Sequence, residues 1–121
     1  MVSGGMAIGS HTHSHELLSR MNQAEQIEDF RQSRTILESQ LGICVDTLAM
    51  PVGSRTSFSK FTAACLEESG YRAAFSFYGG VNLARKTNPF NICRIDGDLD
   101  EGHPMFVLKT SIAAAVGRTF R

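Results

Sequence analysis

The chain has 121 residues, 42% of them hydrophobic, which is enough for one domain with a buried core. Twelve basic and twelve acidic residues give a formal net charge of zero, which argues against nucleic acid as a partner because phosphate binding needs a basic surface. No apolar run approaches the ~20 residues of a membrane span. The first residues show no signal-peptide pattern, so a cytoplasmic location is the default expectation.

The three cysteines carry no motif. Cys44, Cys65 and Cys93 are odd in number, widely spaced and never in a Cys-x-x-Cys pair. We therefore expect reduced and mostly buried thiols.

The first predicted strand leads into a group of histidines. Residues 6–9 are short, apolar and end in glycine, which is typical of a buried strand running into a loop. His11, His13 and His15 follow directly. Next, Asn22 with Glu25 three positions later predicts a capping box and a helix that ends at Gly42.

The spacing of apolar residues orients this helix. One set of side chains is expected to face the core, namely Ile27, Phe30, Leu37 and Leu41. Another set is expected to face water, namely Glu28, Arg31, Glu38 and Gln40.

The rest of the chain alternates between strand-like and helix-like segments. Residues 47–50 predict a buried strand ended by a turn at 51–53. Ser59 is a possible cap of a second helix that ends at Gly70, with Phe61, Ala64, Cys65 and Leu66 as its apolar residues. Later elements are expected as strands at 73–77 and 92–95, an acidic loop at 96–101 and a helix at 105–116.

This alternation indicates an α/β fold with a mostly parallel sheet. Four strands and three helices make about half of a (β/α) barrel, whose full form needs ~250 residues.

The histidine group predicts a metal site. His11 and His15 are four apart, a common zinc-ligand spacing that puts both on one face of a helical turn. His13 would point elsewhere, toward solvent or substrate, and Thr12 and Ser14 could orient the ring nitrogens. The alternative is a polar loop without metal. A catalytic zinc normally has three protein ligands, so two histidines need a third group, often a carboxylate.

Two other segments could contribute to the same site. The turn at 51–53 ends a strand, so its backbone amides could face the histidines and stabilise an oxyanion, although a plain strand-ending turn is the simpler interpretation. The aspartates at 96, 98 and 100 could supply a carboxylate, but their alternation with Gly97, Leu99 and Gly102 favours a solvated turn. His103 is expected at the surface.

These residues resemble the polysaccharide deacetylase family (the NodB-homology domain, carbohydrate esterase family 4). Residues 8–15 are similar to its second motif, Gly-Asn-His-Ser/Thr-x-x-His, which is usually followed by Pro. The two metal-binding histidines of that motif match His11 and His15, and Glu16 stands where the Pro usually is. The resemblance implies a divalent metal cofactor, with zinc as the first candidate.

Three further segments extend the resemblance to nearly the whole chain. Residues 48–53 resemble the third motif, Phe-Arg-Pro-Pro-Tyr-Gly or Phe-Ala-Tyr-Pro-Tyr-Gly. Val52 occupies the position whose backbone amide helps form the oxyanion hole, with Pro51 and Gly53 beside it as substrate-binding candidates together with His13. Residues 66–76 resemble the Gly-Tyr-x-x-Ala-Phe segment, and residues 91–95 resemble the arginine-bearing strand.

The family's first motif, Thr-Phe-Asp-Asp-Gly, supplies the catalytic base and the third metal ligand, and it has no counterpart here. The Leu-Leu-His-Asp motif with the general-acid histidine is also absent. We therefore expect a single NodB-like domain over residues 1–121 that lacks its amino-terminal portion. The resemblance implies metal-dependent hydrolysis of N-acetyl groups on a carbohydrate, with little or no activity for this chain alone.

Two alternatives remain. The first is a non-catalytic remnant or interaction module that binds metal, sugar or a partner chain, with possible self-association at the edge where strands are missing. The second is a histidinol-phosphatase-like phosphoesterase, since residues 11–14 are similar to His-x-His-Ser. That pattern normally has an Asp shortly afterwards, and residues 16–21 contain none, so this alternative ranks lowest.

Overall fold

The computed structural model describes residues 1–83 and 86–94. Its elements in chain order are the 3₁₀ turns η1 (Val2–Gly4) and η2 (Leu18–Arg20), then α1 (Gln23–Leu41), β1 (Thr47–Ala49), α2 (Thr62–Glu68), β2 (Ala73–Ser76) and β3 (Ile92–Cys93). The acidic loop at 96–101, His103 and the helix expected at 105–116 lie outside the described residues.

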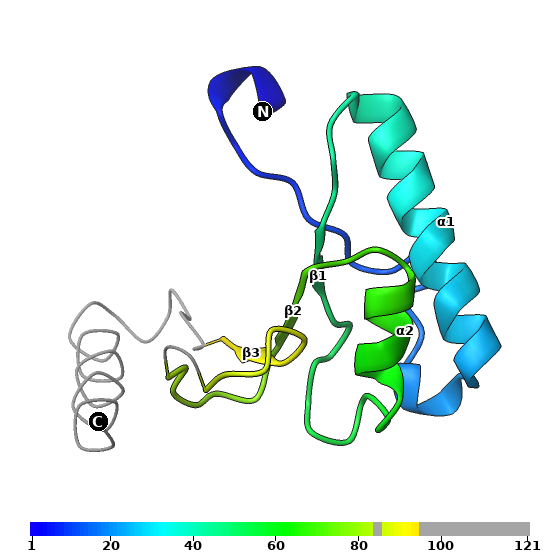
Figure 1. Ribbon diagram of the computed structural model, residues 1–121, viewed down its shortest axis with the longest axis vertical. Coiled ribbons are helices and arrows are strands. Elements are labelled where there is room, and N and C mark those ends of the chain that lie inside the picture. The colour runs from blue at the N-terminus through cyan, green and yellow to red at the C-terminus, as the bar shows by residue number, and fades with distance from the viewer. Residues whose placement is uncertain (84–85, 95–121) are drawn as a thin grey trace.

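The three strands form one parallel sheet in the order β1-β2-β3. Leu48 of β1 lies opposite Ala74 of β2, and Phe75 of β2 lies opposite Ile92 of β3. Both helices lie on the same side of this sheet (Figure 1). α2 connects β1 to β2, and α1 lies in the chain between the bridged residue Ser10 and β1. The predicted α/β class and parallel sheet are confirmed.

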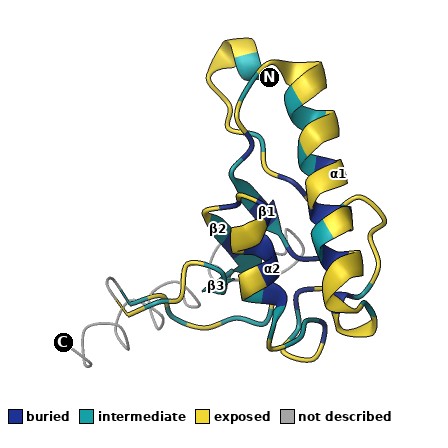
Figure 2. Ribbon diagram, turned by 45° about the vertical axis from the view of Figure 1, so that its right-hand side comes forward, coloured by how far each residue is buried: buried dark blue, intermediate teal, exposed yellow. Residues whose placement is uncertain are grey.

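The core lies between the sheet and the two helices. Phe30 of α1, Leu66 of α2, and Leu48 and Ala74 of the sheet are fully buried. Figure 2 shows the buried face of α1 turned toward the sheet and its exposed face turned away. Full burial of a side chain such as Phe30 contributes about 1.5–3 kcal/mol to folding.

The local signals at both ends of α1 are confirmed. Asn22 accepts a hydrogen bond from the Glu25 amide at 3.0 Å, and the Glu25 carboxylate accepts one from the Asn22 amide at 2.7 Å. Gly42 ends the helix with φ 64°, a left-handed conformation that glycine adopts without a steric penalty. Ile27 and Leu37 pack against the core as expected.

Four details of the prediction were wrong. Leu41 is 38% exposed, because it is the last residue of α1 and lies beyond the sheet that covers the earlier turns. Ser59 does not cap the second helix, because α2 begins at Thr62 and Phe61 is its N-cap residue. Cys44 is exposed because it lies in the loop between α1 and β1, whereas Cys65 is buried and all three thiols are free. Glu38 is only half-buried because it bonds to Arg34 and to the Val45 amide.

The strand expected at residues 6–9 does not form. The segment makes one isolated bridge to β1, in which the Ser10 amide donates to Thr47 O and the Ala49 amide donates to Ser10 O. Residues 6–8 have no ladder partner in the part of the chain that the structure describes. A strand needs paired neighbours, and an apolar run alone does not supply them.

Candidate metal and oxyanion site

The carboxyl ends of the parallel segments bring the candidate residues to one edge of the sheet. His11 follows the bridge at Ser10, and the turn at 51–53 follows β1. The Phe77 amide, just after β2, donates to Gly53 O at 2.7 Å. Arg94, just after β3, donates from Nε to Ser76 O at 3.0 Å. Ligand sites of open α/β sheets lie at this edge.

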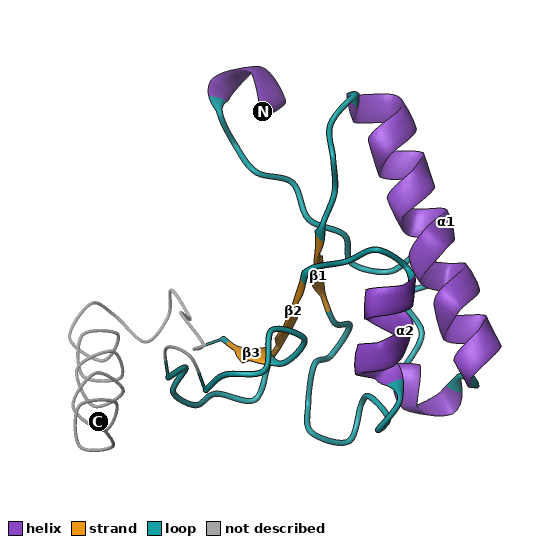
Figure 3. Ribbon diagram, viewed as in Figure 1, coloured by secondary structure: helices purple, strands orange, loops and turns teal. Residues whose placement is uncertain are grey.

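His11 and His15 lie together, but in a loop. Their ring centroids are 4.9 Å apart in an edge-to-face arrangement, and both side chains are exposed. Figure 3 draws the segment as a loop, so the helical turn expected from the spacing is wrong. His15 and Thr12 have positive φ values of 59° and 68°, which bend the chain back and bring the two rings together.

His11 has a fixed ring orientation. Its Nδ1 lies 2.7 Å from the Ala49 carbonyl oxygen, which can only accept, so Nδ1 carries the proton. The opposite nitrogen, Nε2, then has a free lone pair. A backbone carbonyl that holds the second ring nitrogen is the usual support of a metal-binding histidine. The Thr12 and Ser14 hydroxyls accept from the backbone amides of His15 and Glu16, and neither bonds to a histidine ring nitrogen.

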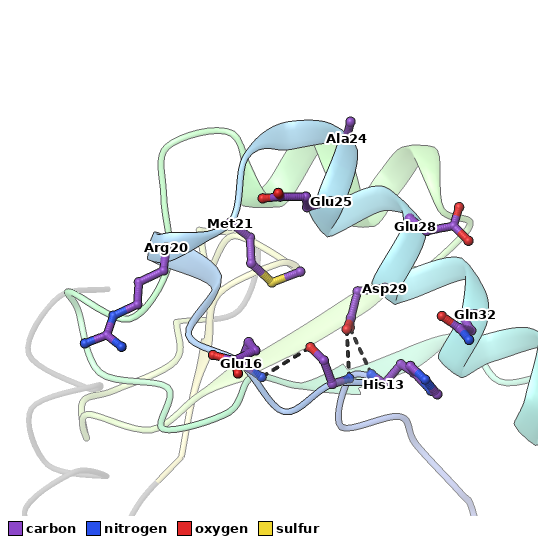
Figure 4. Close-up of a pocket in the computed structure, with 10 residues that line it drawn as sticks. His13, Glu16, Arg20, Met21, Ala24, Glu25, Glu28, Asp29 and Gln32 are labelled. Carbon is purple, nitrogen blue, oxygen red and sulfur yellow. Dashed lines mark hydrogen bonds between the residues drawn. The ribbon is translucent and has the colours of Figure 1, made fainter.

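His13 lies on the other side of the loop. It lines an open pocket of about 680 Å³ against α1, together with Asp29, Glu28 and Gln32. Figure 4 shows this pocket with His13 beside Asp29. The structure therefore separates His13 from the His11–His15 pair, as the spacing predicted.

The turn after β1 has a strained backbone. Val52 has φ 60°, a left-handed conformation that is rare for a β-branched residue. The Gly53 amide donates back to Pro51 O at 2.6 Å, which closes the turn. Pro51 and Gly53 are buried, whereas Val52 is 58% exposed. No acceptor among the described residues pairs with the Val52 amide.

A complete ligand set is not assembled by the described residues. Nowhere in residues 1–83 and 86–94 do three His, Cys, Asp or Glu side chains gather closely enough to hold a metal ion. The imidazoles of His11 and His15 lie together without a third such side chain among these residues. None of the helices within the same residues is long and apolar enough to cross a bilayer.

Two features near the site were not predicted from the sequence. Arg94 lies over the Phe77 ring at 5.2 Å from its centroid. Asp29 is 6% exposed and accepts from the His13 and Ser14 amides. The sequence does contain a pattern that could have indicated Asp29. Three polar residues lie on the buried face of α1 beside Phe30, namely Gln26, Asp29 and Ser33. Buried polar side chains at core positions need partners.

The fold is shared with solved deacetylase structures. A de-N-acetylase from Aggregatibacter actinomycetemcomitans superimposes with a TM-score of 0.66 at 17% identity, over 89% of this chain and 49% of that chain. The Streptococcus pyogenes deacetylase PplD, in complex with acetate, superimposes with a TM-score of 0.62 at 19% identity, over 70% of this chain and 36% of that chain. The protein BA0330 from Bacillus anthracis superimposes with a TM-score of 0.68 at 21% identity, over 78% of this chain and 29% of that chain.

This chain thus spans less than half the length of each of these three proteins. Its sheet and helices correspond to part of a (β/α) barrel, as expected. No curated protein matches the sequence significantly. Residues 1–74, which include both histidines and the turn after β1, match the family described as polysaccharide deacetylase. The chain belongs to the polysaccharide deacetylase family.

Proposed function

We propose that this chain carries the histidine pair and the oxyanion donor of a metal-dependent N-deacetylase that acts on a carbohydrate. The observation that supports it best is the His11–His15 pair, with rings 4.9 Å apart at the carboxyl edge of a parallel sheet. His11 is held through Nδ1 by Ala49 O, so its Nε2 is free to bind a cation. Membership of the polysaccharide deacetylase family supports deacetylation as the reaction class.

The proposed ligands are His11 and His15, with zinc as the first candidate for the cation. A divalent cation at this position supplies Lewis-acid polarisation of a carbonyl oxygen and activates water for attack. The third ligand, an acidic group in the family resemblance, and the catalytic base have no counterpart in this sequence.

The turn at 51–53 supplies the second part of the site. In amide hydrolysis water adds to the acetamide carbonyl, the C–N bond breaks, and acetate and a free amine leave. The carbonyl oxygen becomes negative on the way, and an N–H fixed toward it stabilises that charge. Val52 presents an unpaired amide on an exposed turn. Pro51 and Gly53 shape that turn beneath the substrate, and His13 is a further candidate for substrate contact.

The test is a zinc titration of the chain by calorimetry, with variants of the same loop. We expect wild-type to bind zinc, and His11→Ala and His15→Ala each to lose more than about tenfold in affinity, because even outer partners of a metal site are worth that much. His13→Ala is the matched control, since its ring lines a different pocket. Equal losses in all three variants would contradict the assignment of the pair.

A second assay addresses turnover. With added zinc and acetylated chito-oligosaccharides, the isolated chain should release little or no acetate, because base and third ligand are absent from the sequence. Robust acetate release would show that the chain is complete on its own and would overturn this part of the proposal.

The second candidate function is a non-catalytic module that binds metal, sugar or another chain. The observation that favours it is the absence of a third ligand among the described residues. Its form in solution is testable, because residues 6–8 have no ladder partner in the described structure and could pair with a second copy. Size-exclusion chromatography should then show a dimer, and a monomer would count against pairing of residues 6–8 with a second copy.

A further inference from the structure

The histidine loop is held by side-chain oxygens rather than by backbone pairing. The Thr12 amide donates to Ser10 Oγ at 3.2 Å, and the His15 amide donates to Thr12 Oγ1 at 3.1 Å. The Glu16 amide makes a longer bond of 3.4 Å to Ser14 Oγ. Two of these acceptors, Thr12 Oγ1 and Ser14 Oγ, belong to the middle of the loop and do not fix it relative to the rest of the molecule.

Two further amides of the loop, those of His13 and Ser14, share one acceptor on α1. The His13 amide donates to Asp29 Oδ1 at 2.9 Å, and the Ser14 amide donates to Asp29 Oδ2 at 2.8 Å. Figure 4 shows both bonds, with Asp29 pointing from α1 toward the loop at His13. Asp29 is 6% exposed, and bonds from N–H groups to a buried carboxylate are among the stronger hydrogen bonds in proteins.

The next turn of α1 holds the start of the same loop. Ser33, four residues after Asp29, lies 2.6 Å from Ser10 through the two hydroxyl oxygens. Ser10 is in turn bridged to β1 and accepts from the Thr12 amide. The loop is therefore fixed at Ser10 by β1 and α1 together, and at residues 13 and 14 by Asp29 alone.

We propose that Asp29 is a positioning residue for the metal site. It touches neither His11 nor His15, but it holds the backbone between them, where Thr12 and His15 adopt left-handed conformations. Non-glycine residues remain in that conformation only where their surroundings hold them there. Without both Asp29 bonds, the loop can relax and the two rings separate. The inference rests on the proposed function, since it assumes that the pair binds a cation.

The decisive variant is Asp29→Asn, which keeps the shape of the side chain but replaces one acceptor oxygen by an NH₂ donor. One of the two loop amides then faces a donor and loses its bond. We expect zinc affinity to fall about tenfold or more, the loss typical of outer partners of a metal site. The matched control is Glu28→Gln, an exposed carboxylate one residue earlier on α1, which should bind zinc within about twofold of wild-type. Wild-type affinity in Asp29→Asn would overturn the inference.

A metal-free measurement separates this inference from the proposed function. By NMR, the His13 and Ser14 amides of wild-type should exchange slowly with solvent, and exchange of at least one of them should accelerate about tenfold or more in Asp29→Asn while α1 amides stay protected. Unchanged exchange overturns the role of Asp29 even if zinc binds. Accelerated exchange in a protein that binds no zinc keeps Asp29 as the loop anchor and rejects the metal site.

If Asp29→Asn does not fold, the same two measurements are made on Asp29→Glu. It retains two carboxylate oxygens, so the loop amides should stay protected and zinc should still bind within about tenfold of wild-type. Rapid exchange of both amides in a folded Asp29→Glu protein would contradict a role that depends on the carboxylate.

Discussion

Val52 has a backbone conformation that its side chain disfavours. A β-branched side chain at φ 60° stores strain, and such strain persists only where the surrounding structure imposes it. Here Gly53 holds Val52 in this conformation. Gly53 has a φ of 65°, its amide donates to Pro51 O, and its carbonyl accepts from the Phe77 amide, which together fix the turn. The exposed Val52 amide is therefore presented by a rigid turn, as an oxyanion donor must be.

Gly53→Ala tests this turn. A Cβ at Gly53 would lie 2.5 Å from the Phe77 nitrogen and 2.9 Å from the Phe77 Cβ, so β1 and β2 would have to separate. Gly42→Ala is the matched control, since Gly42 has φ 64° but nothing within 4 Å of an added Cβ. We expect a loss of about 1–2 kcal/mol in the free energy of unfolding for Gly42→Ala, from backbone strain alone. Urea unfolding should show a clearly larger loss for Gly53→Ala, and equal losses would contradict the close approach.

At the scale of elements, α1 is connected to the rest of the molecule through polar groups as well as through its core face. Glu38 accepts from the Val45 amide at 2.9 Å and from Arg34 Nε at 3.0 Å, which fixes the end of the helix against the segment that enters β1. The Val45 amide and the Arg34 guanidinium lower the pKa of the Glu38 carboxyl from its ordinary value of 4.5. Exposed ion pairs alone contribute little, so the amide bond matters more.

The lowered pKa of Glu38 predicts an acid-dependent stability. A carboxyl whose pKa is lower in the folded state stabilises the fold above its unfolded value of 4.5 and loses that contribution as pH falls through the folded value. Glu38→Gln should therefore be less stable than wild-type at neutral pH, and the difference should shrink below about pH 4.5. Urea midpoints measured from roughly pH 3 to 7 check this, with Glu28→Gln reporting the loss of one α1 charge. A difference that stays constant over this range would contradict the prediction.

The sequence predicted features that depend on residues close together in the chain better than features that depend on distant residues. The capping box at Asn22 and the end at Gly42 involve bonds within four residues, so both ends of α1 were predicted correctly. The strand at residues 6–9 was wrong because a strand depends on a partner distant in the chain. His11 and His15 were correctly paired, but their loop geometry depends on Asp29, which lies 15 and 16 residues from the amides that it binds.

At the scale of the whole molecule, the candidate site joins the sheet to the helices. The loop that carries His11 is bonded to β1 through Ser10 and Ala49, and to α1 through Asp29 and Ser33. Leu48 and Phe30, fully buried beneath it, belong to the same core. A change in the conformation of this loop therefore affects both the sheet and α1.

Zinc should consequently stabilise the entire fold. A ligand that binds only the folded state adds RT ln(1 + [L]/Kd), about 2.7 kcal/mol at a hundredfold excess over Kd. We expect zinc to raise the urea midpoint of wild-type, and a chelator to reverse the shift. Circular dichroism of the helices and tyrosine fluorescence should show the same urea midpoint, because the loop is bonded to both layers. His13→Ala should retain this shift and His15→Ala should lose it. If zinc protects only the loop amides from exchange and leaves the midpoint unchanged, the site is not coupled to the fold as these contacts imply.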